Sequence, residues 1–223
     1  SVHALNALAE GCIVCAAGGH IHIHAVHVHM HWLRGALWVL QVIRGMEWAI
    51  SHAAQSPSTP AVFSLSIGGG PSATEDAFVA AAHEAGVTVV VAAGNSADDA
   101  CDYSPGRAPT AINVGATTAE DSFASYSCHG PCVDIMAPGT GVLSSSSISD
   151  TATAVLSGTS MAAPHVAGAA AQLRVRVGVR PCWSGLECGR VRVVRVVRVA
   201  AWRILQGRRC RAAPGRHDGA DLT

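Results

Sequence analysis

The sequence predicts an α/β fold in three layers, with a mostly parallel sheet between helices. Short strands that are almost continuously apolar, such as "VTVVVAA" at 87–93, are typical of a sheet covered on both faces. They alternate with alanine-rich segments whose apolar residues have helical spacing, and this alternation is typical of parallel sheets. With 223 residues, the chain is long enough for one domain with a substantial core.

The first expected elements follow one another in the same alternation. Apolar residues at helical spacing predict a helix over 39–54, and "AVFSLSI" at 61–67 predicts a strand that ends at three glycines. A second helix is expected over 72–86, with Ser72 or Thr74 as its N-cap and two acidic residues in its first turn.

Three further elements complete the predicted core. Short strands are expected at 110–116 and 132–139, and "GTSMAAPHVAGAAAQL" at 158–173 predicts a helix. Ligands of open parallel sheets bind beyond the carboxyl ends of the strands. The loops that contain "SIGGG" and "AAGN" are therefore the expected functional edge.

The two ends of the chain differ in composition from residues 39–173. Residues 1–38 are dominated by a histidine-rich run, and residues 174–223 alternate valine with arginine. The chain has no lysine, and twelve arginines lie after Ala171 against three acidic residues. Arginine density favours nucleic-acid binding, but the low-complexity pattern favours a poorly ordered tail or an out-of-frame stretch. We therefore expect a partial core with a degenerate front and an aberrant tail, and no nucleic-acid partner.

Histidine and cysteine patterns leave metal binding open at two places. Histidines alternate with other residues over 20–31, and imidazoles two positions apart on a strand share a face and can chelate a metal. An unstructured or misread segment is the preferred interpretation of that run. The pairs Cys-x2-Cys at 12–15 and Cys-x3-Cys at 128–132 indicate disulfides of a secreted protein, or plain thiols, more than a zinc site.

No uncharged apolar run of the sequence reaches the roughly 18 residues that a membrane-spanning helix requires, so no membrane partner is expected. The chain starts at Ser1 without a basic segment followed by an apolar stretch. This indicates either a removed leader or a fragment. Together with the cysteines, it favours an extracellular or secretory-pathway protein.

The stretch "LSGTSMAAPHVAG" places Ser160 in a Gly-Thr-Ser turn at the start of an apolar helix. There the hydroxyl lies near backbone N–H groups and the positive end of the helix dipole, which favours a developing oxyanion. Small neighbours allow a peptide to approach. Taken alone, the turn fits an ordinary N-cap serine better than a nucleophile. The longer string around this turn shifts the balance from an N-cap serine toward a nucleophile.

The string "SGTSMAAPHVAG" resembles the nucleophile motif of the subtilase family of serine peptidases, in its proteinase K-like branch. "SLSIGGG", "VTVVVAAGN", "YSPGRAPTAINVGATT" and "FASYSCHGPCVDIMAPGTGVLS" resemble further motifs of the family and stand in its order. Several ordered motifs rarely coincide by chance. The resemblance covers residues 39–173 and implies a three-layer subtilisin-like fold that is truncated at the N-terminus and aberrant at the C-terminus.

The resemblance implies roles for single residues. Ser160 would attack a peptide carbonyl, and Asn95 would donate its amide to the oxyanion; an asparagine that only shapes the turn is the alternative. The residues implied to bind the substrate backbone are Ser66, Ile67, Gly68, Gly69, Ala93 and Gly94. A structural calcium ion would be held by the carbonyls of Pro109 and Ala111 and the carboxylate of Asp134, with a plain surface or capping aspartate as the alternative.

The other two members of the family's catalytic triad lack their motifs here. The family's aspartate stands in Asp-Ser/Thr-Gly and its histidine in His-Gly-Thr-His, and neither string occurs in this sequence. Asp76 is the first aspartate and falls in a predicted helix, and His3 lacks the surrounding motif. His165 follows Ser160 by five residues on the same helix and points about 140° around its axis.

The resemblance therefore implies a subtilisin-like serine endopeptidase domain that acts on polypeptides through an acyl-enzyme. This polypeptide is expected to have little or no activity, because the general base and its orienting acid are missing. A non-catalytic peptide-binding remnant and an incomplete reading of a longer coding sequence are the alternatives. No cofactor is expected for catalysis, and the expected state is a monomer.

Overall fold

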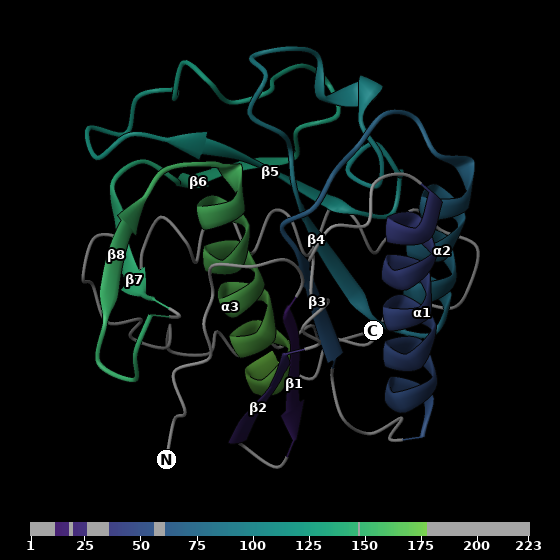
Figure 1. Ribbon diagram of the computed structural model, residues 1–223. Helices are drawn as coiled ribbons and strands as arrows, with labels where there is room; N and C mark the ends of the chain where they lie inside the picture. Colours follow the sequence, from purple (N-terminus) through teal and green to yellow (C-terminus); the bar gives the residue numbers. More distant parts are fainter. Residues whose placement is uncertain (1–11, 18–19, 26–35, 56–60, 147, 178–223) are drawn as a thin grey trace, which may run out of the picture.

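The computed structural model describes residues 12–17, 20–25, 36–55, 61–146 and 148–177. These residues form a six-stranded sheet, a separate two-stranded sheet, and helices on both faces of the larger sheet (Figure 1). In this described part of the chain, no helix is both long enough and apolar enough to cross a membrane.

The larger sheet has the strand order β2-β1-β3-β4-β5-β6. Its strands are β1 Cys12–Ala17, β2 His20–Ala25, β3 Ala61–Leu65, β4 Thr88–Ala92, β5 Ile112–Thr117 and β6 Ile135–Pro138. Strands β3 to β6 run parallel, with Phe63 opposite Val89 and Val114 opposite Ile135. The hairpin of β1 and β2 is antiparallel and extends the sheet beyond β3. The predicted, mostly parallel sheet is confirmed.

The two ends of the chain are described only in part. In the histidine-rich run, the alternation of isoleucine and histidine over 20–25 has the period of a strand, and this stretch pairs with β1. The rest of that run, at 26–35, and the tail from 178 onward lie outside the described residues. The division into a degenerate front, a core over 39–173 and an aberrant tail stays a prediction.

Three helices of the described residues cover the larger sheet. Helices α1 Ala36–Ala54 and α2 Ala73–Glu84 lie on one face, and α3 Thr159–Val177 lies on the other (Figure 1). All three predicted helices are confirmed, with ends shifted by a few residues. Ser72 is the N-cap of α2, because its Oγ accepts a hydrogen bond from the Glu75 N–H at 3.3 Å.

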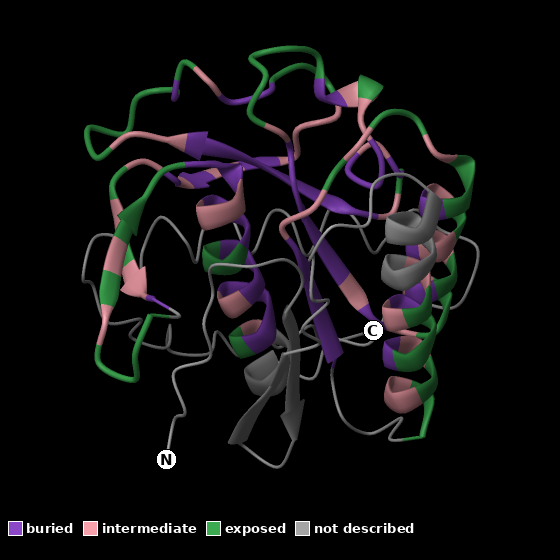
Figure 2. Cartoon of the chain, viewed as in Figure 1, coloured by how far each residue is buried: buried purple, intermediate pink, exposed green. Residues whose placement is uncertain are grey.

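Side chains of β3 and β4 point alternately into two apolar cores. Val62 and Val90 pack in the core beneath α3, whereas Phe63 and Val89 pack in the core beneath α1 and α2. All four residues are buried, and Figure 2 draws β3 and most of β4 in the colour of buried residues. Because helices cover both faces, a polar side chain in these strands is costly to bury, and this explains the largely apolar sequences of β3 and β4.

A second, two-stranded sheet leads into α3. Its strands, β7 Val142–Ser145 and β8 Thr153–Leu156, are antiparallel and were not predicted. Leu143 and Val155 lie opposite each other and are exposed. Strands of four residues whose side chains are exposed or half-buried lack the continuous apolar run by which the buried strands were found. This hairpin delivers the chain directly to the start of α3.

Glu75 is an exception among the residues that α2 turns toward the core. Its side chain is only 4% exposed and lies on the same helix face as Val79 and Ala82. Burial raises the pKa of the Glu75 carboxyl, and the charge of Asp76 raises this pKa further. The folded chain therefore holds the proton of the Glu75 carboxyl more tightly than the unfolded chain does.

This pKa shift predicts how the free energy of unfolding depends on pH. Below the ordinary pKa of glutamate, both states are protonated and the shift has no effect. As pH rises through that value, the unfolded chain loses its proton first, so the folded state loses stability and remains less stable at neutral pH. The variant Glu75→Gln should therefore gain stability relative to the unmodified chain at pH 7 more than at pH 4.

Urea unfolding at both pH values measures this difference. Glu84→Gln, which replaces an exposed carboxyl in the last turn of the same helix, is the control and should show a smaller pH dependence. Equal effects of Glu75→Gln at the two pH values would contradict the prediction.

Candidate active site

The candidate site lies where β3 and β4 part from each other. The two strands pair in parallel up to Leu65 and Val91. Beyond this point the chain after β4 bonds to β5, whereas the chain after β3 pairs with Ser104. Segments 66–69 and 93–95 thus diverge at the carboxyl ends of two parallel strands, where ligands of such sheets bind.

Ser160 is the second residue of α3 and is half-buried. Its backbone oxygen accepts a hydrogen bond from Ser66 Oγ at 2.9 Å, which joins the helix start to the segment after β3. The first N–H groups of a helix have no partner inside the helix, and the helix dipole is positive at this end. The structure therefore places this serine at a helix N-terminus beside the predicted substrate edge.

Asn95 is held against the same helix start through its side-chain oxygen. Asn95 Oδ1 accepts one hydrogen bond from the Thr159 N–H at 2.8 Å and another from Thr159 Oγ1 at 3.0 Å. Both bonds use the acceptor end of the amide, so the donor end, Nδ2, points to the other side. Asn95 is exposed, and its donor is therefore open to a ligand. This is the orientation that an oxyanion donor requires.

Thr159 is the buried centre of this arrangement and has no exposed surface. Its Oγ1 accepts a hydrogen bond from the Gly94 N–H at 3.1 Å while it donates to Asn95 Oδ1. One hydroxyl therefore fixes the turn 93–95 to the start of α3. This role was not predicted from the sequence, although Thr159 stands next to Ser160, because a threonine before a helix is ordinarily interpreted as a cap.

Only glycine fits at Gly94. Its φ of 107° lies in the region that side chains rarely adopt, and an added Cβ would lie 2.9 Å from Cys128 Sγ. Cys128 is a buried thiol whose N–H donates to the Gly94 carbonyl at 2.9 Å. The turn before Asn95 is therefore fixed by its contact with Cys128 as well as by its hydrogen bond to Thr159.

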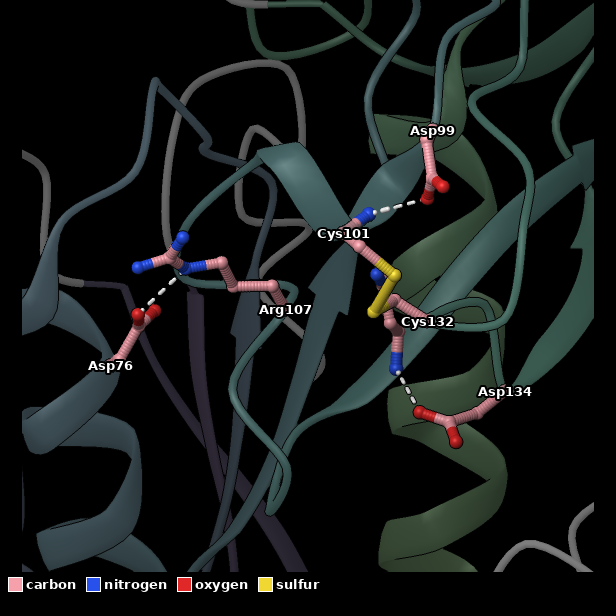
Figure 3. The surroundings of a disulfide bond; sticks show 7 residues. Asp76, Asp99, Cys101, Arg107, Cys132 and Asp134 are labelled. Atoms are coloured by element: carbon pink, nitrogen blue, oxygen red, sulfur yellow. Dashed lines mark hydrogen bonds and ion pairs between the residues drawn. A yellow bond between two sulfur atoms is a disulfide. The ribbon is translucent and has the colours of Figure 1, made fainter.

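The loop that follows Asn95 is fastened to residues 126–132. Backbone hydrogen bonds connect the two segments, and a disulfide joins Cys101 to Cys132 (Figure 3). Sequence patterns left open whether the cysteines are paired, and both forms occur, since Cys128 is a thiol. Among the described residues, no group of three or more histidine, cysteine or acidic side chains is placed to hold a metal.

The histidine and aspartate considered as triad partners lie elsewhere. His165 is exposed, and its Nδ1 is 2.8 Å from the carbonyl oxygen of Met161 on its own helix. Asp76 pairs with Arg107 at 2.8 Å (Figure 3). His3 and the second half of the histidine-rich run lie outside the described residues. None of the candidate substitutes is thus placed against the Ser160 hydroxyl in the described part of the chain.

The residues predicted to hold calcium lie close to the start of β5. Asp134 Oδ2 accepts a hydrogen bond from the Asn113 N–H at 2.9 Å, which places this carboxylate beside the chain that leaves Ala111 (Figure 3). The Thr110 hydroxyl and the Asn113 side-chain amide are buried without hydrogen-bond partners in the same stretch. Carboxylate and carbonyl oxygens are the ligand types that a hard cation prefers, and calcium binding by Pro109, Ala111 and Asp134 stays a prediction.

A serine at a helix N-terminus beside an asparagine amide, on a three-layer α/β fold, is the arrangement of a serine hydrolase. Comparison with known proteins specifies the family. Residues 12–183 match the sequence profile of the Subtilase family. The chain belongs to this family, and the resemblance noted from the sequence is confirmed.

Individual relatives agree with this assignment. The chain is 53% identical over 130 residues to an extracellular serine proteinase of Thermus sp. (strain Rt41A), over 58% of this chain and 31% of that protein. It is 49% identical over 130 residues to a cuticle-degrading serine protease of Arthrobotrys oligospora, over 58% and 31% of the two chains. The crystal structure of a cold adapted subtilisin-like serine proteinase matches with a TM-score of 0.58 and 41% identity, over 69% of this chain and 51% of that one.

The predicted subtilisin-like fold class is thereby confirmed. The chain spans about a third of the length of the curated relatives it matches. The activity of a whole subtilase is therefore a matter for proposal.

Proposed function

We propose that this chain is a subtilisin-like serine endopeptidase domain with Ser160 as its nucleophile, and that this polypeptide alone has little or no hydrolytic activity. The observation that carries the proposal is the double hydrogen bond from Thr159 to Asn95 Oδ1. It turns the amide donor outward at the start of α3. A merely structural asparagine has no need to stay exposed with its donor directed away from the fold.

The chemistry proposed for this arrangement is acyl transfer. Ser160 Oγ attacks a peptide carbonyl carbon, and the negative charge that develops on the carbonyl oxygen is stabilised by Asn95 Nδ2 and the Ser160 N–H. The attack also releases the hydroxyl proton, which needs a base. Neither His-Gly-Thr-His nor Asp-Ser/Thr-Gly occurs in the sequence, so the attack is expected to be very slow.

The proposed substrate is a polypeptide that adds as a strand along residues 66–68. Ser66 and Ile67 are half-buried, and Gly68 is exposed, so the backbone of this segment borders solvent. The Gly69 N–H already donates to the Ser104 carbonyl at 2.9 Å. Gly69 therefore lies next to the bound peptide in this proposal, but its N–H is not available to donate to the peptide. A peptide-binding domain without catalysis uses the same segment and is the second candidate function.

An extracellular or secretory-pathway location is proposed on two grounds. Relatives such as the Thermus enzyme are named extracellular proteinases. The disulfide between Cys101 and Cys132 is of the kind that persists in oxidising compartments. A monomeric state, and the lack of nucleic-acid and membrane partners, stay predictions from the sequence.

Calcium is proposed as a structural ion and not as a participant in catalysis. The carbonyls of Pro109 and Ala111 and the carboxylate of Asp134 would hold it and join the loop before β5 to β6. A ligand that binds only the folded state raises stability. Calcium at millimolar concentration should therefore raise the Tm, and Asp134→Ala should abolish the increase. A Tm that does not change with calcium, or an increase that persists in the variant, would contradict this site.

The lack of activity is tested with a fluorophosphonate probe, which reacts with activated serines. This polypeptide should be labelled no more than its Ser160→Ala variant, because no base activates the hydroxyl. An active subtilase in the same gel is the positive control. Labelling at Ser160 that disappears in Ser160→Ala would contradict the proposed inactivity.

Sequencing the transcript upstream of the Ser1 codon separates the two candidate functions. A longer chain that carries both missing motifs should be labelled at Ser160, which supports the endopeptidase. A transcript without them favours the peptide-binding domain.

A further inference from the structure

The predicted substrate segment is held at both of its ends by hydrogen bonds. At one end, Ser66 Oγ donates to the backbone oxygen of Ser160. At the other end, Gly69 pairs with Ser104 as in an antiparallel ladder, with N–O distances of 2.9 Å and 3.2 Å. Between them lie Ile67, which packs against the core beneath α1 and α2, and Gly68, which has little conformational preference of its own. The position of the backbone at Gly68 and Gly69 therefore depends strongly on the second attachment.

The second attachment depends in turn on α2. Ser104 has no exposed surface, and its Oγ donates to Asp76 Oδ1 at 2.7 Å while it accepts from the Ser72 N–H at 2.9 Å. The hydroxyl is thus engaged in both roles. It connects the loop that pairs with Gly69 to the first turn of a helix that is packed against the sheet.

Asp76 is itself oriented by a cation. Its other oxygen, Oδ2, accepts a hydrogen bond from Arg107 Nε at 2.8 Å (Figure 3). Arg107 belongs to the same loop as Ser104, and its N–H donates to the Tyr103 carbonyl at 2.9 Å. The Asp76 carboxylate therefore accepts hydrogen bonds from two residues of this loop, Ser104 and Arg107. Without Asp76, the buried Ser104 hydroxyl would lose the acceptor for its proton.

We propose that Asp76 is a positioning residue for peptide binding. Through Ser104 it fixes Gly69, and thereby holds segment 66–69 apart from the turn 93–95 at the separation that a bound peptide needs. Asp76 acts only through Ser104 and has no part in the chemistry. The inference rests on the proposed function, in which a peptide adds along residues 66–68.

The first measurement is amide hydrogen exchange, which needs no ligand. Asp76→Ala should accelerate exchange of the Gly69 and Ser104 N–H groups by about tenfold or more, while the amides of β4 stay unchanged. Asp76→Asn keeps an acceptor for Ser104 and should remain near the original rates. Val79→Ala is the matched control, because it removes packing from the same helix and leaves the polar contacts in place.

The second measurement is binding of a fluorescein-labelled Ala-Ala-Ala-Phe peptide by fluorescence anisotropy, with all variants in a Ser160→Ala background to exclude turnover. Asp76→Ala should raise the Kd about tenfold, the effect of losing one charge-assisted hydrogen bond. Asp76→Asn should raise it less. Val79→Ala should lower the Tm at least as much as Asp76→Ala does, with an unchanged Kd.

The outcomes separate this inference from the proposed function. Unchanged exchange at Gly69 in Asp76→Ala overturns the positioning role whatever the peptide does. Faster exchange with an equal Kd, or an equally raised Kd in Val79→Ala, overturns the role in peptide binding alone. A parent chain that binds no peptide contradicts the proposed function and this inference with it, even where exchange is accelerated.

Discussion

The candidate site depends on the side chain of Thr159, a buried hydroxyl between two segments that are 64 residues apart in the sequence. Its hydrogen bonds to Asn95 and Gly94 join the turn after β4 to the first turn of α3. In the low-dielectric interior these hydrogen bonds are stronger than in water. A buried polar group that lost its hydrogen-bond partner there would lower the stability of the fold. The Thr159 backbone N–H donates to the same oxygen of Asn95, so side chain and backbone of Thr159 together fix the orientation of the Asn95 amide.

A second principle of the architecture is the divergence of β3 and β4 at their carboxyl ends. Two parallel strands that stay paired throughout leave no room for a ligand, so each chain must find another partner where they part. The chain after β4 bonds to β5, and the chain after β3 bonds to Ser104 and, through Ser66, to α3. The proposed nucleophile, Ser160, and the proposed oxyanion donor, Asn95, are both positioned by this scaffold. Activation of the nucleophile requires residues that the sequence motifs do not supply.

Features that arise from local pattern were predictable from the sequence. Continuous apolar runs identified the buried strands, and Ser72 with its following acids identified the start of α2. The string around Ser160 identified the family. Long-range partners were not predictable in this way: Ser104 and Asp76 are 28 residues apart, and the disulfide joins cysteines 31 residues apart. No role was predicted for Thr159, because its partners Asn95 and Gly94 are 64 and 65 residues away. The hairpin of β7 and β8 lacks a buried face that would mark it.

Thr159 and Asn95 act as one unit in this structure, and a double-mutant cycle tests their coupling most directly. The free energy of unfolding is measured for the parent chain, Thr159→Val, Asn95→Ala and the double variant. Residues in one hydrogen-bond network typically couple by about 0.5–3 kcal/mol, and we expect a coupling of at least about 1 kcal/mol here. Losses that simply add, with a coupling near zero, would contradict the role of Thr159 as the residue that orients Asn95.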